Sequence, residues 1–141
     1  MSNTPIRALL GKLGIDVHNR GIITVAEMFR NAGMEVIYFG NALPAQIAQT
    51  ALQEAVDLVG VSSLGGAHLT LGQALIQEAR RLDIYEQTVF LIGGVFPPQD
   101  AHRLTEAGFD GVFTPEATRS EIIAAVQDLV QKKRSPVSAG P

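Results

Sequence analysis

The stretch IRALLGKLGIDVHNRG, residues 6–21, contains the pattern from which the fold can be predicted. Its first half, Ile6 to Leu13, is mostly apolar and is typical of a buried strand, and a helical pattern begins at Ile22. The residues between them therefore form a loop at the carboxyl end of a strand. In open α/β sheets, ligands bind at that edge.

The same alternation of strand and helix occurs five times along the chain. The expected strands are residues 6–13, 35–39, 58–62, 89–92 and 111–113, and the expected helices are residues 22–32, 44–54, 67–82, 98–107 and 120–131. Apolar strands separated by helices predict a five-stranded parallel sheet covered on both faces, in the flavodoxin-like order 2-1-3-4-5. We expect one Rossmann-like domain over residues 1–131 and a disordered polar tail over residues 132–141.

Composition narrows the class of protein. The 141 residues carry a net charge of -3 without a basic run, which argues against nucleic acid as a partner. The chain contains no cysteine, so disulfides, thiolate metal sites and thiol nucleophiles are excluded. The apolar runs are too short to span a membrane and the amino terminus lacks an apolar signal core, so we expect a cytoplasmic protein with no membrane partner.

Small and polar residues follow alternate strands of the predicted sheet. Asp16, His18 and Gly21 follow the first strand, Ser62 to Gly66 the third, and Gly93-Gly94 the fourth. In this fold these loops face one pocket at the switch point between the first and third strands. A loop histidine can bind a metal, and a carboxylate nearby can fix its tautomer. Taken singly, each motif has an ordinary explanation as surface, turn or helix cap.

Together, Asp16-x-His18-x-x-Gly21, Ser62-x-Leu64 and Gly93-Gly94 resemble the cobalamin-binding domain of adenosylcobalamin-dependent mutases. The surrounding sequence, such as His68-Leu69-Thr70-Leu71, is most similar to the acyl-CoA mutases, which include the methylmalonyl-, isobutyryl- and 2-hydroxyisobutyryl-CoA enzymes. The resemblance covers about residues 5–130. Because no other domain accompanies these motifs, the chain resembles the separate small subunit that some of these enzymes have.

The resemblance implies a role for each motif residue. His18 is expected to replace the cofactor's own dimethylbenzimidazole as the lower axial ligand of cobalt, and Asp16 to accept a hydrogen bond from its other ring nitrogen. Ser62 is expected to bond the base of the displaced nucleotide tail, and Leu64 to pack against it. The remaining expected cofactor-binding residues are Arg20, Gly21, Gly93, Gly94 and Thr114. At the glycines a Cβ would intrude on the cofactor.

The sequence departs from the family pattern at three places. Val17 stands where glycine is common, and Asn19 where aspartate is common. The last strand is followed by Thr114-Pro115-Glu116-Ala117-Thr118 rather than Gly-Pro-Gly-Thr. The third departure puts the contacts of that loop with the cofactor in doubt, but it does not touch His18.

The activity implied by the resemblance is a radical rearrangement of an acyl-CoA, an isomerase reaction, with adenosylcobalamin as cofactor. No catalytic residue is expected on this chain. The acyl-CoA site is expected on a large mutase subunit, so the chain is expected to be inactive alone and to act in a heteromer.

Four other functions are compatible with parts of the same sequence pattern. They are the small subunit of an amino-acid mutase such as glutamate mutase, a corrinoid protein for methyl transfer, a non-catalytic cobalamin carrier or sensor, and a phosphoacceptor receiver domain. A receiver needs an aspartate after the third strand and a lysine after the fifth, where this chain has Ser62 and Thr114. Methyl-transfer proteins usually carry a helical domain before the first strand, whereas only five residues precede the first expected strand in this sequence.

Several polar residues have no place in the motifs. His68, near the start of a helix, is either structural or partner-facing, and His102 is expected to be solvated. Asp57 should lie at the opposite end of the sheet from the pocket, and Asp100 and Asp110 at the surface or at caps. The cluster Lys132-Lys133-Arg134 is a favourable charge at a helix end.

Overall fold

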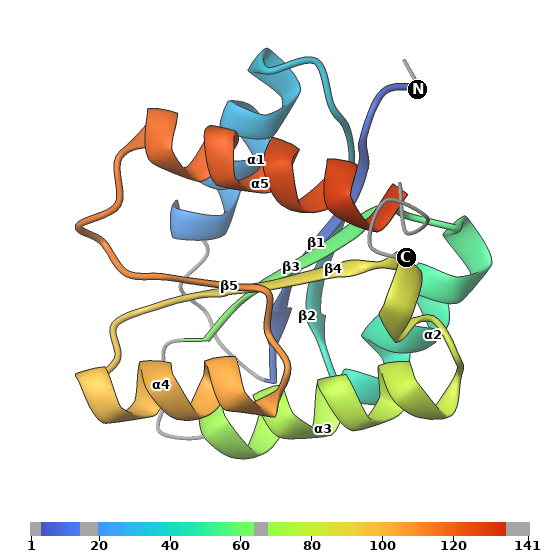
Figure 1. Ribbon diagram of the computed structural model, residues 1–141, viewed down its shortest axis with the longest axis vertical. Coiled ribbons are helices and arrows are strands. Elements are labelled where there is room, and N and C mark those ends of the chain that lie inside the picture. Colours follow the sequence, from blue (N-terminus) through green and yellow to red (C-terminus); the bar gives the residue numbers. More distant parts are fainter. Residues whose placement is uncertain (1–3, 15–19, 64–67, 135–141) are drawn as a thin grey trace, which may run out of the picture.

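The computed structural model of the chain describes residues 4–14, 20–63 and 68–134, in which a layer of strands lies between two layers of helices (Figure 1). The strands are β1 (Arg7–Leu13), β2 (Glu35–Ala42), β3 (Leu58–Ser62), β4 (Val89–Gly93) and β5 (Gly111–Phe113). The helices are α1 (Arg20–Asn31), α2 (Pro44–Glu54), α3 (His68–Arg81), α4 (Pro98–Ala107) and α5 (Arg119–Arg134), with a short 3₁₀ helix, η1 (Tyr85–Gln87), before β4.

The sheet confirms the predicted topology. Its five strands are parallel and lie in the order β2-β1-β3-β4-β5. Helices α1 and α5 cover one face, and α2, α3 and α4 cover the other (Figure 1). Successive side chains of a strand enter opposite cores: Val89 and Leu91 pack on the side of α1 and α5, whereas Phe90 and Ile92 pack on the other side. Every strand between the sheet edges is therefore apolar on both faces.

Two helices end at glycine, as the sequence predicts. Gly33 after α1 and Gly108 after α4 have φ angles of +91° and +126°, in the region that favours glycine. The Gly108 N–H also donates to the carbonyl oxygens of Leu104 and Thr105 at the end of α4.

Two elements extend three residues beyond their predicted carboxyl-terminal ends. Strand β2 continues through Gly40-Asn41, a pair typical of a turn, because β1 supplies partners for both residues after a register shift. Helix α5 continues through Lys132–Arg134, which the sequence predicts to belong to the disordered tail. Long-range ion pairs of Lys133 and Arg134 with Asp110 and Asp57 hold that last turn, and residues 135–141 lie outside the described part of the chain.

None of the helices within the described ranges has both the length and the apolar character that crossing a membrane requires.

Candidate functional site

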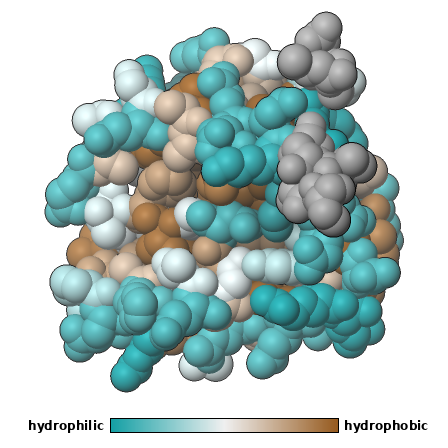
Figure 2. All heavy atoms as spheres, in the orientation of Figure 1, coloured by the Kyte–Doolittle hydropathy of each residue, from teal (hydrophilic) through white to brown (hydrophobic). Residues whose placement is uncertain are grey.

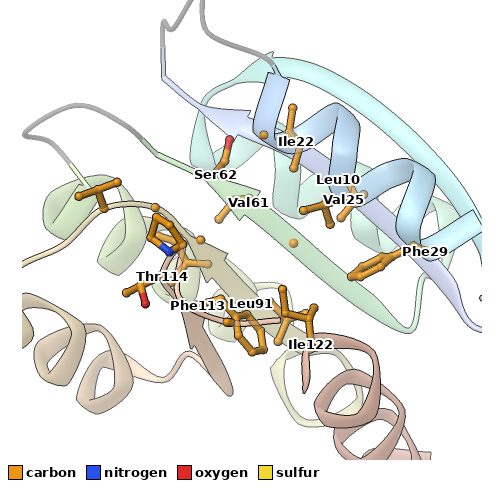
Figure 3. A pocket seen from close by; sticks show the side chains of 18 residues that line it. Leu10, Ile22, Val25, Phe29, Val61, Ser62, Leu91, Phe113, Thr114 and Ile122 are labelled. Atoms are coloured by element: carbon orange, nitrogen blue, oxygen red, sulfur yellow. The ribbon is translucent and has the colours of Figure 1, made fainter. Parts of the chain in front are cut away.

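A cavity of about 340 Å³ lies against the face of the sheet that α1 and α5 cover. Its apolar lining comes from the sheet (Leu10, Leu91, Phe113), from α1 (Ile22, Val25, Phe29) and from α5 (Ile122). The α1 side chains lie across the cavity from Phe113 and Ile122 (Figure 3). On the molecular surface, apolar atoms gather in a hollow between α5 and α4, at the left of Figure 2.

Two rows of residues cross the sheet beneath the cavity. The row nearer the middle of the strands is Leu10, Gly60, Leu91 and Gly111, and the row nearer their carboxyl ends is Lys12, Ser62, Gly93 and Phe113. In the first row the leucines lie over the glycines: a Cβ on Gly60 would come 2.7 Å from Leu10 Cδ2. In the second row a Cβ on Gly93 would meet nothing closer than the Phe113 carbonyl oxygen at 3.7 Å. Leucine side chains therefore fill the space over the glycines in the middle of the strands, whereas the space beside Gly93, at the end of β4, is open.

Gly21 widens the same space from the helix side. It lies in the first turn of α1 and lines the cavity, and a Cβ added to it would have no heavy atom within 4 Å. The packing of the protein thus does not require glycine at Gly21 or Gly93.

Few polar groups reach this apolar cavity. Ser62, the last residue of β3, and Thr114, which follows β5, both line it. The Thr114 hydroxyl donates a hydrogen bond to the Glu116 carboxylate, and this bond is the main reason that the pKa of Glu116 is below its ordinary value. A bound ligand that needs the proton of the Thr114 hydroxyl must compete with Glu116.

Backbone hydrogen bonds join the loops at the carboxyl ends of the strands. The Ser63 N–H donates to the Gly93 carbonyl oxygen at 3.2 Å, and the Gly94 N–H donates to the Phe113 carbonyl oxygen at 3.1 Å. Gly94 is enclosed, since a Cβ there would lie 2.5 Å from the Ser63 carbonyl oxygen and 2.8 Å from the Phe96 ring. Close approach of neighbouring chain therefore explains this glycine without a ligand.

Five predicted site residues lie together, as expected. Gly21, Ser62, Gly93, Gly94 and Thr114 all line the cavity, although they come from four separate places in the chain.

The other predicted site residues are Asp16, His18, Arg20 and Leu64. Asp16, His18 and Leu64 lie outside the described residues, and Arg20 begins α1 without a described side chain. Within residues 4–14, 20–63 and 68–134, no group of three or more His, Asp or Glu side chains could hold a metal ion. The cobalt-ligand role of His18 thus remains a prediction from the sequence.

The sequence reasoning missed most of the cavity's walls. Ile22, Val25 and Phe29 are spaced three and four residues apart and so share one face of α1, but that spacing equally describes a helix packed on a core. The motifs also give Lys12 no role, although the residue is only 4 % exposed and lies in the same row as Ser62. A lysine within an apolar strand is the signal that could have identified it.

The structure favours the structural interpretation of His68. The residue is 8 % exposed, and its Nε2 lies 2.9 Å from Asp100 Oδ2. Asp100 is correspondingly not a plain surface or cap residue, because its side chain is 18 % exposed and bonded to His68. His102 is exposed, as predicted, beside Glu106.

Comparison with known proteins gives consistent results. The B12 binding domain family matches residues 6–124. The chain is 39% identical over 134 residues to the 2-hydroxyisobutanoyl-CoA mutase small subunit of Aquincola tertiaricarbonis, covering 92% of this chain and 96% of that one. It is 38% identical over 133 residues to the pivalyl-CoA mutase small subunit of Xanthobacter autotrophicus, covering 93% and 88%.

Solved structures share the fold. A cobalamin-binding protein from Desulfitobacterium hafniense superposes with a TM-score of 0.75 over 88% of this chain and 58% of that one. The sequence identity is 18%, so this likeness concerns the fold alone.

Proposed function

Because the chain belongs to the B12-binding domain family, we propose that it binds adenosylcobalamin and presents it to a separate large subunit for rearrangement of an acyl-CoA. Its relatives of similar length are small subunits of CoA mutases, which are isomerases. The observation that carries the proposal is the apolar cavity, which four residues of the family's motifs line: Gly21, Ser62, Gly93 and Gly94.

The cavity suits the nucleotide tail of the cofactor. Its apolar walls would bury the faces of a dimethylbenzimidazole ring, which gains free energy by leaving water. Gly21 and Gly93 leave open the space that a Cβ would occupy. Ser62 offers a hydroxyl that can bond the base, and Leu64 is expected to pack against it.

His18 would hold the cobalt of the cofactor, and Asp16 would orient the His18 ring. Both follow β1, the strand that contributes Leu10 to the cavity, and they are spaced so that one carboxylate can orient one imidazole. Arg20 begins the helix that forms one wall and is proposed to contact the cofactor beside them. Imidazole ligation requires that the cofactor's own base leave the cobalt, and the cavity would accommodate that base.

In this proposal the chain contributes binding and orientation rather than a reacting group. Adenosylcobalamin, when bound, supplies the radical chemistry of the mutase reaction. The protein's apolar walls exclude water from the tail, and the loops joined at Ser63, Gly93 and Phe113 hold the cofactor at the edge of the sheet. The acyl-CoA site, and with it the choice of substrate, is assigned to the large subunit, and the assembly to the cytoplasm.

Electron paramagnetic resonance of the chain with cob(II)alamin tests the mode of binding. The protein is labelled with nitrogen-15 histidine, and wild type is compared with His18→Ala and, as control, His102→Ala, which removes an exposed histidine. Hyperfine coupling of cobalt to nitrogen-15 in wild type and His102→Ala, and its loss in His18→Ala, would support the proposal. Coupling only to the cofactor's unlabelled base in wild type would contradict it.

The need for a second polypeptide is tested separately. The chain loaded with adenosylcobalamin is expected to convert none of the branched acyl-CoA substrates alone, and to do so when a large mutase subunit is added. Product formation is followed by chromatography of the CoA esters. Turnover by the chain alone would refute the assignment of the acyl-CoA site to a partner.

A further inference from the structure

A buried polar pair lies at the cofactor edge of the sheet but outside the cavity. His68 is the first residue of α3, and Asp100 lies in the first turn of α4. His68 Nε2–H donates to Asp100 Oδ2 at 2.9 Å, and the His68 ring packs against Phe96 with ring centroids 4.9 Å apart. The side chains of His68 and Asp100 are 11 % and 18 % exposed. The pair therefore connects the starts of two neighbouring helices.

The same region anchors the chain that leaves β3. The Ser63 N–H donates to Gly93, and the chain returns at His68, which contacts Phe96 and Asp100. Both flanks of residues 64–67 are thus attached to one connection, the one that runs from β4 into α4. That connection begins at Gly94, next to Gly93, and both glycines line the cavity; a Cβ on Gly94 would lie 2.5 Å from the Ser63 carbonyl oxygen and 2.8 Å from the Phe96 ring.

From this geometry we propose that His68 and Asp100 are positioning residues for cofactor binding, acting through the Gly93-Gly94 turn and the end of β3. The inference rests on the proposed function, since it assumes that cobalamin occupies the cavity. Neither residue lines the cavity. Their hydrogen bond joins the start of α3 to the first turn of α4, and so holds together the ends of the two loops that follow Ser62 and Gly93.

Stability alone does not explain the pair. A buried histidine–carboxylate pair contributes little over well-packed apolar side chains of the same volume, because both groups must be removed from water. A hydrogen bond differs from an apolar contact in being directional, so it sets one relative placement of the helices. The Asp100 charge is also favourable at the amino-terminal end of α4.

Equilibrium dialysis of the purified chain with adenosylcobalamin tests the proposal. Wild type is measured first, because failure of wild type to bind would refute the proposed function itself. His68→Ala and Asp100→Ala are then compared with Asp100→Asn, which keeps an acceptor for His68. His102→Ala is the matched control, since it removes an exposed histidine–carboxylate pair from α4. Circular dichroism at the dialysis temperature verifies that each variant is folded.

We expect His68→Ala and Asp100→Ala to raise the Kd about 10-fold to 100-fold, the range found for residues that orient ligand-binding groups. The variant that combines His68→Ala with Asp100→Ala should bind cobalamin no more weakly than whichever of the two single variants has the higher Kd. Asp100→Asn should retain most of the wild-type affinity. The fraction of bound cob(II)alamin coordinated by protein histidine should fall in the alanine variants, which a purely structural role would not cause. If His68→Ala does not fold, the two Asp100 variants carry the comparison.

Wild-type affinity in the folded alanine variants would overturn the inference and leave the proposed function intact. So would a loss no larger than that of His102→Ala, or equal losses for Asp100→Ala and Asp100→Asn.

Discussion

At the scale of single residues, the cavity separates two kinds of glycine that the sequence cannot distinguish. Gly94 is required by the chain itself, because its missing Cβ would meet a backbone oxygen at 2.5 Å. Gly93, its neighbour, has only ordinary contact distance around the same position and lines open space. Adjacent glycines therefore serve the fold in one case and, in our proposal, the ligand in the other.

This difference predicts opposite effects of alanine at the two positions. Gly94→Ala should lower the free energy of unfolding by about 1–3 kcal/mol, the usual cost of overpacking. Gly93→Ala should leave it within about 1 kcal/mol of wild type, since the residue does not have a positive φ. Gly93→Ala should instead weaken cobalamin binding by about tenfold, because the methyl group occupies part of the cavity.

Urea unfolding and cobalamin titration of the two variants, made side by side, measure both effects. A Gly93→Ala protein that binds cobalamin as tightly as wild type would mean that the cofactor does not reach the end of β4.

At the scale of elements, α5 is held at its carboxyl end by half-buried charges as well as by its apolar face. Lys133 Nζ donates to the carbonyl oxygens of Tyr85 and Thr88 at 2.9 and 2.8 Å and lies 3.2 Å from Asp110 Oδ2. Arg134 pairs with Asp57 at 2.9 Å. These contacts tie α5 to the edge of the sheet opposite the cavity, which fixes one wall-forming helix without using the site.

The contacts predict unequal effects for two neighbouring lysines. Lys133→Met should lower the free energy of unfolding by about 1–3 kcal/mol, because it removes charge-assisted hydrogen bonds from a half-buried site. Lys132→Met is the control: its pair with Asp128 is exposed and should contribute less than about 1 kcal/mol. Chemical denaturation of the two variants gives the comparison, and equal losses would show that Lys133 acts only as a surface charge.

The stability of the amino-terminal end of α5 depends on pH through the Glu121 carboxylate. Glu121 Oε1 accepts a hydrogen bond from the Thr118 N–H at 2.8 Å, and the Thr118 hydroxyl accepts one from the Glu121 N–H. The bond from the Thr118 N–H is the main cause that lowers the pKa of Glu121 below its ordinary 4.5. The resulting stabilisation is complete above pH 4.5 and is lost as the pH falls through the lower, folded-state pKa.

Glu121→Ala should therefore be less stable than wild type at pH 7, and this difference should shrink as the pH falls from 4.5 toward 3. Glu121→Gln keeps the geometry of the cap without a group that titrates, so its difference from Glu121→Ala should stay constant. Urea unfolding at a series of pH values follows both. A wild-type advantage over Glu121→Ala that does not change with pH would contradict the assignment to the ionised carboxylate.

Element bounds could be predicted from the sequence where local patterns decide them, and not where distant contacts do. The bounds of α2, β3, α4 and β5 follow from proline, glycine and apolar runs and agree with the structure. The ends of β2 and α5 depend on partners far along the chain: β1 for the first and Asp57 and Asp110 for the second.

The same division applies to the site. Gly21, Ser62, Gly93 and Thr114 were predictable, since parallel topology brings strand ends together at one edge. Phe29 and the other apolar wall residues were not, because a side chain that lines a cavity and one that fills a core have the same pattern in sequence.

At the scale of the whole molecule, the cavity lies between parts of the chain that are distant in sequence. One wall is α1, and the other is formed by β5 and the beginning of α5. A tail that fills the space would make apolar contacts with both walls at once. In our proposal, cofactor binding therefore stabilises the entire domain and not only the loops at the sheet edge.

Thermal unfolding should reveal this coupling. At a cobalamin concentration of 100 times the Kd, mass action should stabilise the folded chain by about 2.7 kcal/mol. For a domain of this size the Tm should rise by about 9 °C. Cobinamide, which has the corrin ring but no nucleotide tail, should bind more weakly and therefore raise the Tm less at the same concentration. Equal shifts with cobinamide and cobalamin would mean that the apolar cavity does not receive the tail, even if the corrin binds at the edge of the sheet.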